Sequence, residues 1–276
     1  MTFSLVARDP DTGQLGIAVA SCTLAVGRAV PWARAGVGAV ATQASSNRGY
    51  GPRALDLLAA GTEAADALDR LVAGDADAAQ RQVGVIGVTG APAGWTGGEC
   101  LPACGQVVAD GVAALGNMLA SRSVVPSLAQ GYAEATGDLA ARLLAALRAG
   151  ADSGGDLRGR QAAALLVVAG ERDDAAPWEG VRVDLRVDDA PDPIAELARL
   201  LRLQRAYESG DWETLAREAP DGVRDLHAAL AAAQRGDRDA ARGALQALRT
   251  RPGWEGWLRR LRVNGRLPAT DELLRY

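Results

Sequence analysis

The sequence predicts an α+β fold, in which antiparallel sheets are covered by helices, followed by a small all-α unit. Strand-like runs occur in clusters, and two consecutive helical segments separate one cluster from the next. A doubly wound α/β fold would instead alternate single strands with single helices. Beyond residue 207 only short amphipathic helical patterns follow. The chain therefore divides into an α+β domain at residues 1–207 and a helical domain at residues 208–276.

The first fifty residues contain the clearest strand pattern. Apolar runs at residues 2–9 and 15–22 flank a Pro-Asp-Thr-Gly turn sequence at residues 10–13. Two β-rich runs joined by such a turn predict a β-hairpin. A third run at residues 36–43 predicts a strand beside that hairpin.

Helices and further strands follow along the rest of the first domain. Proline is favoured in a first helical turn, so the next helix begins near Pro52, and Thr62 is the expected N-cap of a second helix. The strand at residues 181–187 alternates polar and apolar residues, which indicates one wet face. The other predicted elements are strands at 82–88, 93–97, 112–119 and 163–168, loops at 98–111 and 153–161, two helices within 124–149, and a helix at 194–207.

Composition excludes several classes of function. All thirty basic residues are arginine, which excludes Schiff-base catalysis and a P-loop lysine. The single histidine, His227, excludes a His-rich zinc site and a Ser-His-Asp triad in the first domain. A net charge of −4 provides no general basic field for nucleic acid. We therefore expect a small-molecule substrate, with no nucleic-acid partner, no metal and no cofactor.

The cysteines and the apolar runs bear on the compartment. Three cysteines are an odd number without a paired framework, as expected of reduced thiols in a cytosolic protein. No run approaches the ~20 apolar residues of a membrane span, and the N-terminus lacks a signal-peptide pattern. We expect a cytoplasmic protein without membrane contact. A sheet edge and an alanine-rich helical surface are compatible with a homodimer.

Thr2 is the first candidate for catalysis. If Met1 is removed, Thr2 presents a hydroxyl nucleophile and a free α-amine that can act as its general base. The ordinary pKa of an α-amine, about 7.7–8.0, suits that role. The alternative is that a Thr after Met permits processing and has no catalytic meaning. A retained Met1 would turn the nitrogen into an amide, which cannot act as a base.

Polar residues at the ends of other predicted strands extend this candidate site. Cys22 offers a thiol nucleophile, although a small buried residue is the simpler interpretation. Asn117 and Gln43 can donate side-chain amides to an oxyanion, or can cap turns. In the glycine-rich loop, Arg158 and Arg160 can bind a carboxylate or phosphate, or can be solvated charges. Neighbouring polar residues complete the expected substrate-binding set: Ser21, Thr42 and Asn47.

Two other clusters could hold a metal but have simpler interpretations. Carboxylates can bind a hard cation, yet turn formation and helix capping explain such a run more simply. The carboxylates in question are Asp184, Asp188, Asp189 and Asp192. Cys100 and Cys104 have no nearby histidine, so they are a weak signal for a metal pair.

An ordered set of segments in the first domain carries a family resemblance. The segments are Thr-Phe-Ser-Leu-Val-Ala-Arg-Asp at 2–9, Gly-Ile-Ala-Val-Ala-Ser at 16–21, the run 25–43, Leu-Gly-Asn-Met-Leu at 115–119, the run 159–168, and Asp-Leu-Arg-Val-Asp at 184–188. Together they closely resemble the bacterial domain of unknown function 1028 family, over roughly residues 2–205.

The resemblance implies a fold and a chemistry. That family is classed with the Ntn-hydrolase-like (N-terminal nucleophile) proteins, which implies a four-layer αββα sandwich. In that superfamily an N-terminal Thr, Ser or Cys hydrolyses an amide, and this position corresponds to Thr2. The chain lacks lysine, so a Thr-Lys pairing cannot operate. Arg160 or a backbone dipole would have to tune the nucleophile.

The C-terminal segment is similar to a peptidoglycan-binding domain that accompanies this family. The similarity runs from Gly253–Leu258 through Gly265–Pro268. Trp254 and Trp257 lie three residues apart on one helix face. They could form an aromatic sugar platform, but anchors for helix packing are the simpler interpretation.

These inferences lead us to expect a hydrolase of a small amide or cyclic amide. Thr2 would attack, its α-amine would take the proton, and Asn117 or Gln43 would stabilise the oxyanion. Arg160 would hold a substrate carboxylate. Two alternatives stay open. One is a non-catalytic Ntn-like scaffold that binds a small anion or a peptidoglycan fragment, and the other is a hydrolase that uses the Cys22 thiol.

Overall fold

The computed structural model of the protein describes residues 2–264, with side chains through residue 260. The chain forms two compact units that divide between Ala198 and Arg199. This division lies inside helix α5 (Pro193–Ser209), and the boundary predicted after residue 207 falls near the end of the same helix.

Two antiparallel sheets form the centre of the first unit. The larger sheet has the strand order β10-β9-β2-β1-β8-β7, and the smaller has the order β3-β4-β5-β6. The strands of the larger sheet are β1 (Thr2–Arg8), β2 (Leu15–Ser21), β7 (Gly105–Ala109), β8 (Val112–Asn117), β9 (Ala162–Val168) and β10 (Val181–Val187). Those of the smaller sheet are β3 (Pro31–Arg34), β4 (Gly38–Ala44), β5 (Arg81–Gly87) and β6 (Ala93–Thr96).

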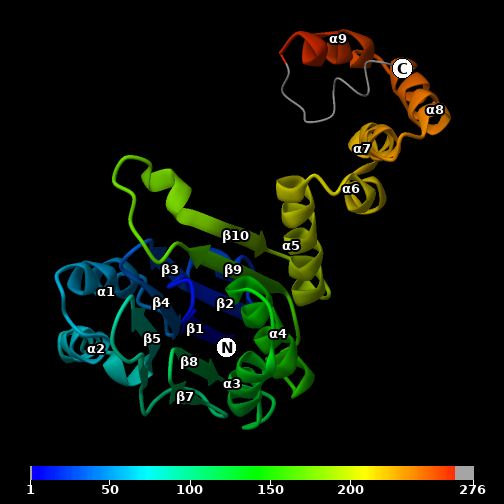
Figure 1. Cartoon of the computed structure of the whole chain (residues 1–276). Coiled ribbons are helices and arrows are strands. Elements are labelled where there is room, and N and C mark those ends of the chain that lie inside the picture. The colour runs from blue at the N-terminus through cyan, green and yellow to red at the C-terminus, as the bar shows by residue number, and fades with distance from the viewer. Residues whose placement is uncertain (1, 265–276) are drawn as a thin grey trace. The chain divides into compact units, whose positions relative to one another are not determined.

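Helices cover the outer face of each sheet, and the inner faces pack against each other (Figure 1). Helices α1 (Tyr50–Ala59) and α2 (Ala64–Ala73) lie on the smaller sheet. Helices α3 (Val124–Glu134) and α4 (Leu139–Asp152) lie on the larger sheet. The central strand β1 contacts β4 and β5 of the opposite sheet. The mixed α+β class predicted from the sequence is confirmed.

The predicted N-terminal hairpin is present and has a clear local cause. The Asp9 carboxylate accepts hydrogen bonds from the main-chain N–H groups of Asp11 and Thr12, at 3.2 and 2.8 Å. Gly13 then adopts a positive φ of 67°, which glycine tolerates without steric cost. The turn sets the register in which Phe3 lies opposite Ala20.

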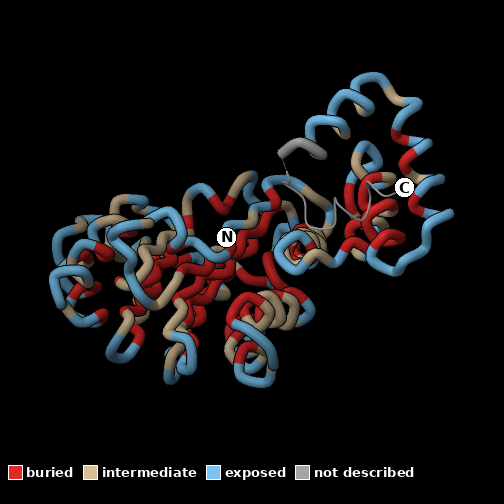
Figure 2. Tube along the Cα trace, turned by 45° about the horizontal axis from the view of Figure 1, so that its top comes forward, coloured by how far each residue is buried: buried red, intermediate tan, exposed pale blue. Residues whose placement is uncertain are grey.

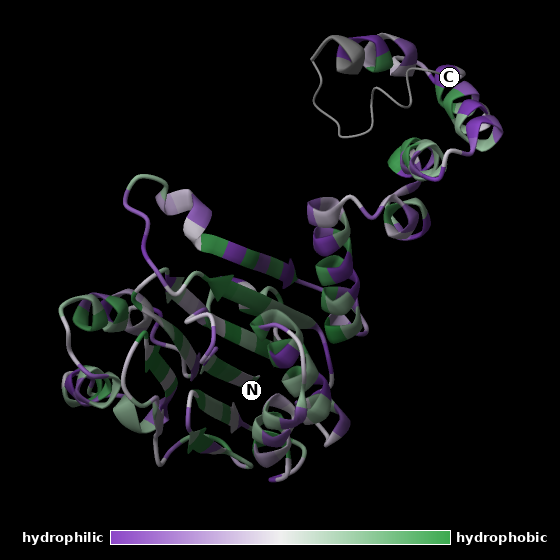
Figure 3. Ribbon diagram, in the orientation of Figure 1, coloured by the Kyte–Doolittle hydropathy of each residue, from purple (hydrophilic) through white to green (hydrophobic). Residues whose placement is uncertain are grey.

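The core between the sheets is built from small and branched aliphatic residues rather than aromatic ones. Figure 2 shows that buried residues concentrate in the strands, and Figure 3 shows the same strands as predominantly hydrophobic. Glycine makes close packing possible at one crossing. A Cβ atom at Gly84 would lie 2.5 Å from Cδ1 of Leu115. The fully buried Leu115 therefore fills the space that the missing side chain leaves.

Two local predictions were wrong, and one strand was missed. The expected loop 98–111 contains strand β7, a five-residue edge strand in which Gln106, Val108 and Ala109 are exposed, so its only apolar signal is the short run at residues 107–109. Strand β3 was not predicted, because Pro31 and Arg34 bound a stretch of only four residues. Helix α2 has Glu63 rather than Thr62 as its N-cap, without a side-chain capping bond.

The described part of the second unit, through residue 264, is helical, as predicted, and repeated Gly-Asp pairs organise it. Gly210 and Gly236 adopt positive φ angles. The Asp that follows each one caps the next helix by accepting a main-chain hydrogen bond, from Thr214 and Ala240 respectively. The helices are α6 (Trp212–Glu218), α7 (Asp221–Gln234), α8 (Arg238–Arg249) and α9 (Trp254–Asn264).

The two tryptophans of α9 contact each other edge to face, with ring centroids 5.1 Å apart. Trp254 packs against the apolar core of the second unit, whereas Trp257 is exposed. Residues 265–268, which contribute to the predicted peptidoglycan-binding similarity, lie outside the described residues. Within the described part of the chain, no helix is both long enough and apolar enough to cross a membrane.

We expect Leu115→Ala to lower the free energy of unfolding by about 2–5 kcal/mol, because it opens a cavity between the sheets. Urea-induced unfolding measures this loss. Leu24→Ala is the matched control, since this side chain is 63% exposed, and its effect should stay within about 0.5 kcal/mol. Equal effects of the two substitutions would contradict the packing described for Leu115.

Candidate functional site

Five polar side chains meet between the two sheets, at the end where β1 begins. Thr2 begins β1, Ser21 and Asn117 end β2 and β8, Gln43 lies near the end of β4, and Gln82 is the second residue of β5. All five are buried. Buried polar groups without partners are costly, so the hydrogen bonds among them define the site.

Thr2 contacts this cluster through both its hydroxyl and its carbonyl group. Its Oγ1 donates to the hydroxyl of Ser21 at 3.2 Å. Its main-chain oxygen accepts from Nε2 of Gln43 at 3.4 Å and from Nδ2 of Asn117 at 3.5 Å. Thr2, Ser21, Gln43 and Asn117, which the sequence analysis selected separately, are therefore neighbours.

The side chain of Gln82, which was not among the residues predicted for the site, links this cluster. Its Oε1 accepts from Gln43 at 2.7 Å and from Asn117 at 2.9 Å. Its Nε2 donates to the main-chain oxygens of Gly116 and Gly105 and to the hydroxyl of Thr96. The only available signal was an amide at the start of an otherwise apolar strand run.

The main-chain oxygens at the ends of this network set the direction of its amide hydrogen bonds. Main-chain oxygens can only accept, so they orient the Gln82 amide with Nε2 toward Gly116 and Oε1 toward Gln43 and Asn117. The N–H groups of Gln43 and Asn117 are thereby committed to Gln82 and to the Thr2 carbonyl. The hydroxyl of Ser4 donates to Oε1, the side-chain oxygen of Gln43, at 2.7 Å. The two amides thus hold the main chain of Thr2.

The glycine-rich loop is anchored by the buried carboxylate of Asp156. Its Oδ2 accepts from the main-chain N–H of Cys22 at 2.7 Å, and its Oδ1 accepts from that of Arg158 at 2.9 Å. The Arg158 guanidinium also contacts this carboxylate. The half-buried Cys22 thiol lies 3.7 Å from the main-chain oxygen of Arg158. Cys22 and Arg158 are therefore held against Asp156 beside the cluster.

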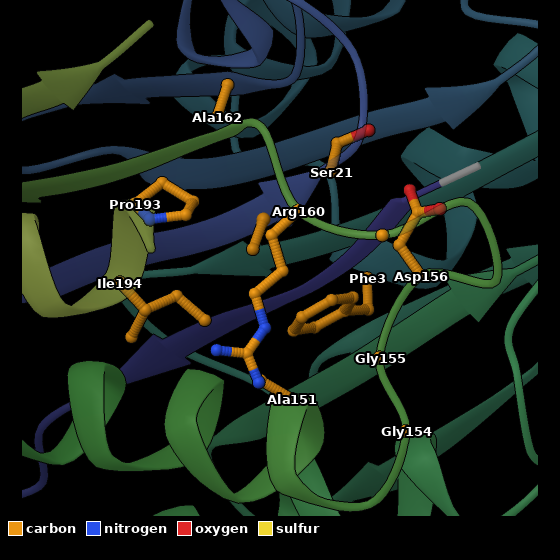
Figure 4. Close-up of a pocket in the computed structure, with 12 residues that line it drawn as sticks. Phe3, Ser21, Ala151, Gly154, Gly155, Asp156, Arg160, Ala162, Pro193 and Ile194 are labelled. Atoms are coloured by element: carbon orange, nitrogen blue, oxygen red, sulfur yellow. The ribbon is translucent and has the colours of Figure 1, made fainter. Parts of the chain in front are cut away.

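A pocket of about 70 Å³ adjoins the cluster at Ser21. The side chain of Arg160 extends between Ile194 and Phe3 toward Ala151 (Figure 4). The residues that line the pocket are Phe3, Ala20, Ser21, Ala151, Gly154, Gly155, Asp156, Gly159, Arg160, Ala162, Pro193 and Ile194.

Arginine and aspartate set the charge of this pocket. Arg160 and Arg148 both contact Oδ2 of Asp192, at 3.2 and 3.3 Å. A main-chain hydrogen bond from Ala195 and the two arginines lower the pKa of Asp192, so the carboxylate is ionised at neutral pH. Two guanidinium groups that share one carboxylate leave a net positive charge beside the pocket, which suits an anionic group.

Thr42 and Asn47 do not join the cluster. Successive residues of a strand face opposite sides, so Thr42 points to the helix-covered face of β4 while Gln43 points inward. The Thr42 hydroxyl donates to the main-chain oxygen of Asn47 at 3.2 Å. The Asn47 amide in turn donates to the carboxylate of Asp75 at 3.1 Å.

Asp75 belongs to a separate ion-pair cluster on that side of the sheet. Its carboxylate pairs with Arg81 at 3.0 Å, and both side chains are almost fully buried. Hydrogen bonds from Arg81 and Asn47 hold the pKa of Asp75 far below its usual range. Burial and the adjacent Asp75 raise the pKa of Tyr50 to about 12. This cluster fixes the loop between β4 and α1.

Three of the four carboxylates considered as cation ligands have structural contacts instead, and the thiols of Cys100 and Cys104 donate to the main-chain oxygens of Arg81 and Cys100 at 3.3 and 3.4 Å. Asp184 pairs with Arg186, Asp189 accepts from Gln161, and Asp192 caps α5 by accepting from Ala195. Among the residues that the structure describes, no three His, Cys, Asp or Glu side chains converge as metal ligands do.

Comparison with known proteins identifies the family. Residues 2–197 match a family of unknown function, DUF1028. The chain belongs to this family. Its structure is similar to the crystal structure of protein SPO2555 from Silicibacter pomeroyi, also assigned to DUF1028, with a TM-score of 0.66 and 33% sequence identity over 74% of this chain and 85% of that one. No curated protein matches the chain.

The family membership confirms the resemblance found in the sequence. The match covers the first unit and ends inside α5, just before the second unit begins at Arg199. DUF1028 is described as a family of unknown function, so the match assigns no reaction to the site.

We expect Gln82→Ala to destabilise the protein by about 2–4 kcal/mol, because it leaves several buried amide and carbonyl groups without partners. Urea-induced unfolding measures the change. Gln106→Ala is the matched control, since Gln106 is exposed and water can replace its contacts. A loss for Gln82→Ala no larger than that of the control would show that the network does not order the site.

The protein should become less stable as the pH is lowered, because Asp75 then becomes protonated. Its folded-state pKa is lowered, so its contribution is complete above the unfolded pKa of about 3.9 and is lost as pH falls below that value. Asp75→Asn should be less stable at neutral pH and lose less stability on acidification. Urea midpoints between about pH 6 and pH 2.5 measure both effects. The exposed Asp69→Asn should keep the wild-type slope, and an unchanged slope in Asp75→Asn would contradict the assignment.

Proposed function

We propose that this protein is a hydrolase of a small amide or cyclic amide, of the Ntn type, with Thr2 as its nucleophile. One observation carries the proposal: the hydroxyl residue that becomes N-terminal when Met1 is removed begins the central strand and lies in a buried polar cluster. The arrangement of two facing sheets with helices outside each one supports a four-layer αββα sandwich of this type.

The proposed reaction uses the two functional groups of Thr2. Its hydroxyl oxygen attacks the substrate carbonyl carbon, while the free α-amine accepts the hydroxyl proton. The carbon–nitrogen bond then breaks, and the departing amine takes that proton. Water hydrolyses the resulting ester and releases the acid, which restores Thr2. A base attached to the nucleophile needs neither lysine nor histidine.

The surrounding side chains would position the nucleophile. Gln43 and Asn117 hold the Thr2 carbonyl, and Ser21 bonds to its hydroxyl. The amide N–H groups of Gln43 and Asn117 could stabilise an oxyanion only by releasing a hydrogen bond to Thr2 or Gln82. The geometry therefore favours a role for these two amides in positioning Thr2. Arg160, beside the pocket at Ser21, would hold a carboxylate of the substrate.

A covalent probe tests this proposal without knowledge of the substrate. A β-lactone acylates an activated hydroxyl, and intact mass followed by peptide mapping locates the adduct. Loss of Met1 and an acyl group on Thr2 are expected. Thr2→Ala should abolish labelling of this residue and Thr2→Ser should retain it.

Cys22→Ala is the matched control and should label as the wild type does. An adduct confined to Cys22 would favour the thiol-dependent alternative. A protein that retains Met1 completely and forms no adduct would leave the non-catalytic scaffold as the better explanation.

A further inference from the structure

Three large apolar side chains are exposed on loops at the end of the sheets where Thr2 lies. Leu24, Leu101 and Leu157 are 63%, 55% and 65% exposed. Leu24 follows β2, Leu101 precedes β7, and Leu157 belongs to the glycine-rich loop before β9. Single exposed leucines are common on protein surfaces. These leucines indicate a binding surface only if they lie close to one another and to Thr2.

Leu101 and Leu157 both form main-chain hydrogen bonds with Met118. The main-chain N–H of Met118 donates to the oxygen of Leu101 at 2.8 Å, and the N–H of Leu157 donates to the oxygen of Met118 at 3.5 Å. Met118 directly follows Asn117, which is the strand partner of Thr2. Both leucines therefore lie next to the end of the nucleophile's own strand pair.

The conformation of Met118 supports this arrangement. Its φ is +53°, a left-handed conformation that is uncommon for a residue other than glycine. Such conformations occur mainly where the surroundings impose them, and they cluster at functional sites. Here the bonds to Leu101 and Leu157 hold the residue in place.

The third leucine is linked to the second through Arg158. The guanidinium of Arg158 donates to the hydroxyl of Thr23 at 3.2 Å, and its main-chain oxygen contacts the thiol of Cys22 at 3.7 Å. Leu24 follows Thr23, and Leu157 precedes Arg158. The loops that carry Leu24 and Leu157 are thus bound to each other beside Ser21, whose hydroxyl bonds to Thr2.

We propose that Leu24, Leu101 and Leu157, here called the leucine rim, bind an apolar acyl chain of the substrate. The substrate class is then an amide whose acyl part is a hydrocarbon chain, and its carbonyl carbon is the atom that Thr2 attacks. This inference rests on the proposed function, because Thr2 fixes the position of the carbonyl group. Apolar side chains exposed around a nucleophile gain free energy when a ligand chain removes them from water.

A chain-length series tests the rim. Burial of one methylene group favours binding by about fourfold at most, so β-lactones with alkyl chains of increasing length should label Thr2 about twofold to fourfold faster per methylene until the rim is covered. The combined variant Leu24→Ser, Leu101→Ser and Leu157→Ser should lose most of this increase. The readout is the ratio of long-chain to short-chain labelling rates.

Val181→Ser is the matched control. Val181 is 50% exposed, but it pairs with Val168, which lies opposite Leu15 at the far end of β2 from Ser21. This variant should keep the wild-type ratio. A wild-type ratio that does not change with chain length, or a full increase in the rim variant, would overturn the inference while labelling of Thr2 by the short probe still supports the proposed function.

A second measurement separates the two proposals if no probe labels Thr2. That result would remove the proposed function, and calorimetric titration with primary alkanamides of increasing chain length would then decide the rim alone. Tighter binding of longer chains by the wild type, lost in the rim variant, supports the rim. Absence of binding, or binding that the rim variant retains, overturns it.

Discussion

The hydrogen bonds of the Gln82 side chain are the constraint on which the rest of the site depends. They join the start of β5 to the end of β8, across the interface between the sheets. Because main-chain oxygens fix one end of the Gln82 amide, its other end fixes Gln43 and Asn117, and these two hold the Thr2 carbonyl. A buried network of this kind stabilises one arrangement only when every member has its partner. The position of Thr2 is thus set by side chains of β4 and β8, which Gln82 of β5 holds in turn.

The site has a rigid side and a side made of loops. On the rigid side, the side-chain amides of Gln43, Gln82 and Asn117 lie near strand ends and bond to one another between the two sheets. On the other side, Asp156 anchors the glycine-rich loop to Cys22, and Met118 joins that loop to the segment at Leu101. This division is a common one, because a rigid scaffold positions reactive groups while loops provide contacts that select a ligand. The exposed leucines occur on the loop side, and the buried amides occur on the rigid side.

Much of the fold could be predicted from the sequence, because its signals are local. The N-terminal hairpin follows from two apolar runs and the Asp9 turn, and the Gly-Asp pairs mark helix starts in the second unit. Strands β3 and β7 escaped prediction, since one is very short and the other is an exposed edge. Gln82 also escaped, because an amide in a strand carries no local sign of what faces it.

The sequence by itself determined most of the strand pattern, the family, and the presence of a hydroxyl residue at the start of the central strand. Only the tertiary structure decided which polar residues meet there. Thr42 and Gln43 are adjacent in the chain, yet the two-residue period of a strand sends one to the helix-covered face and the other to Thr2. Gln82 and Asn117 reach the same point from distant parts of the chain. Stacking of the two sheets creates that meeting point, and no local pattern encodes how sheets stack.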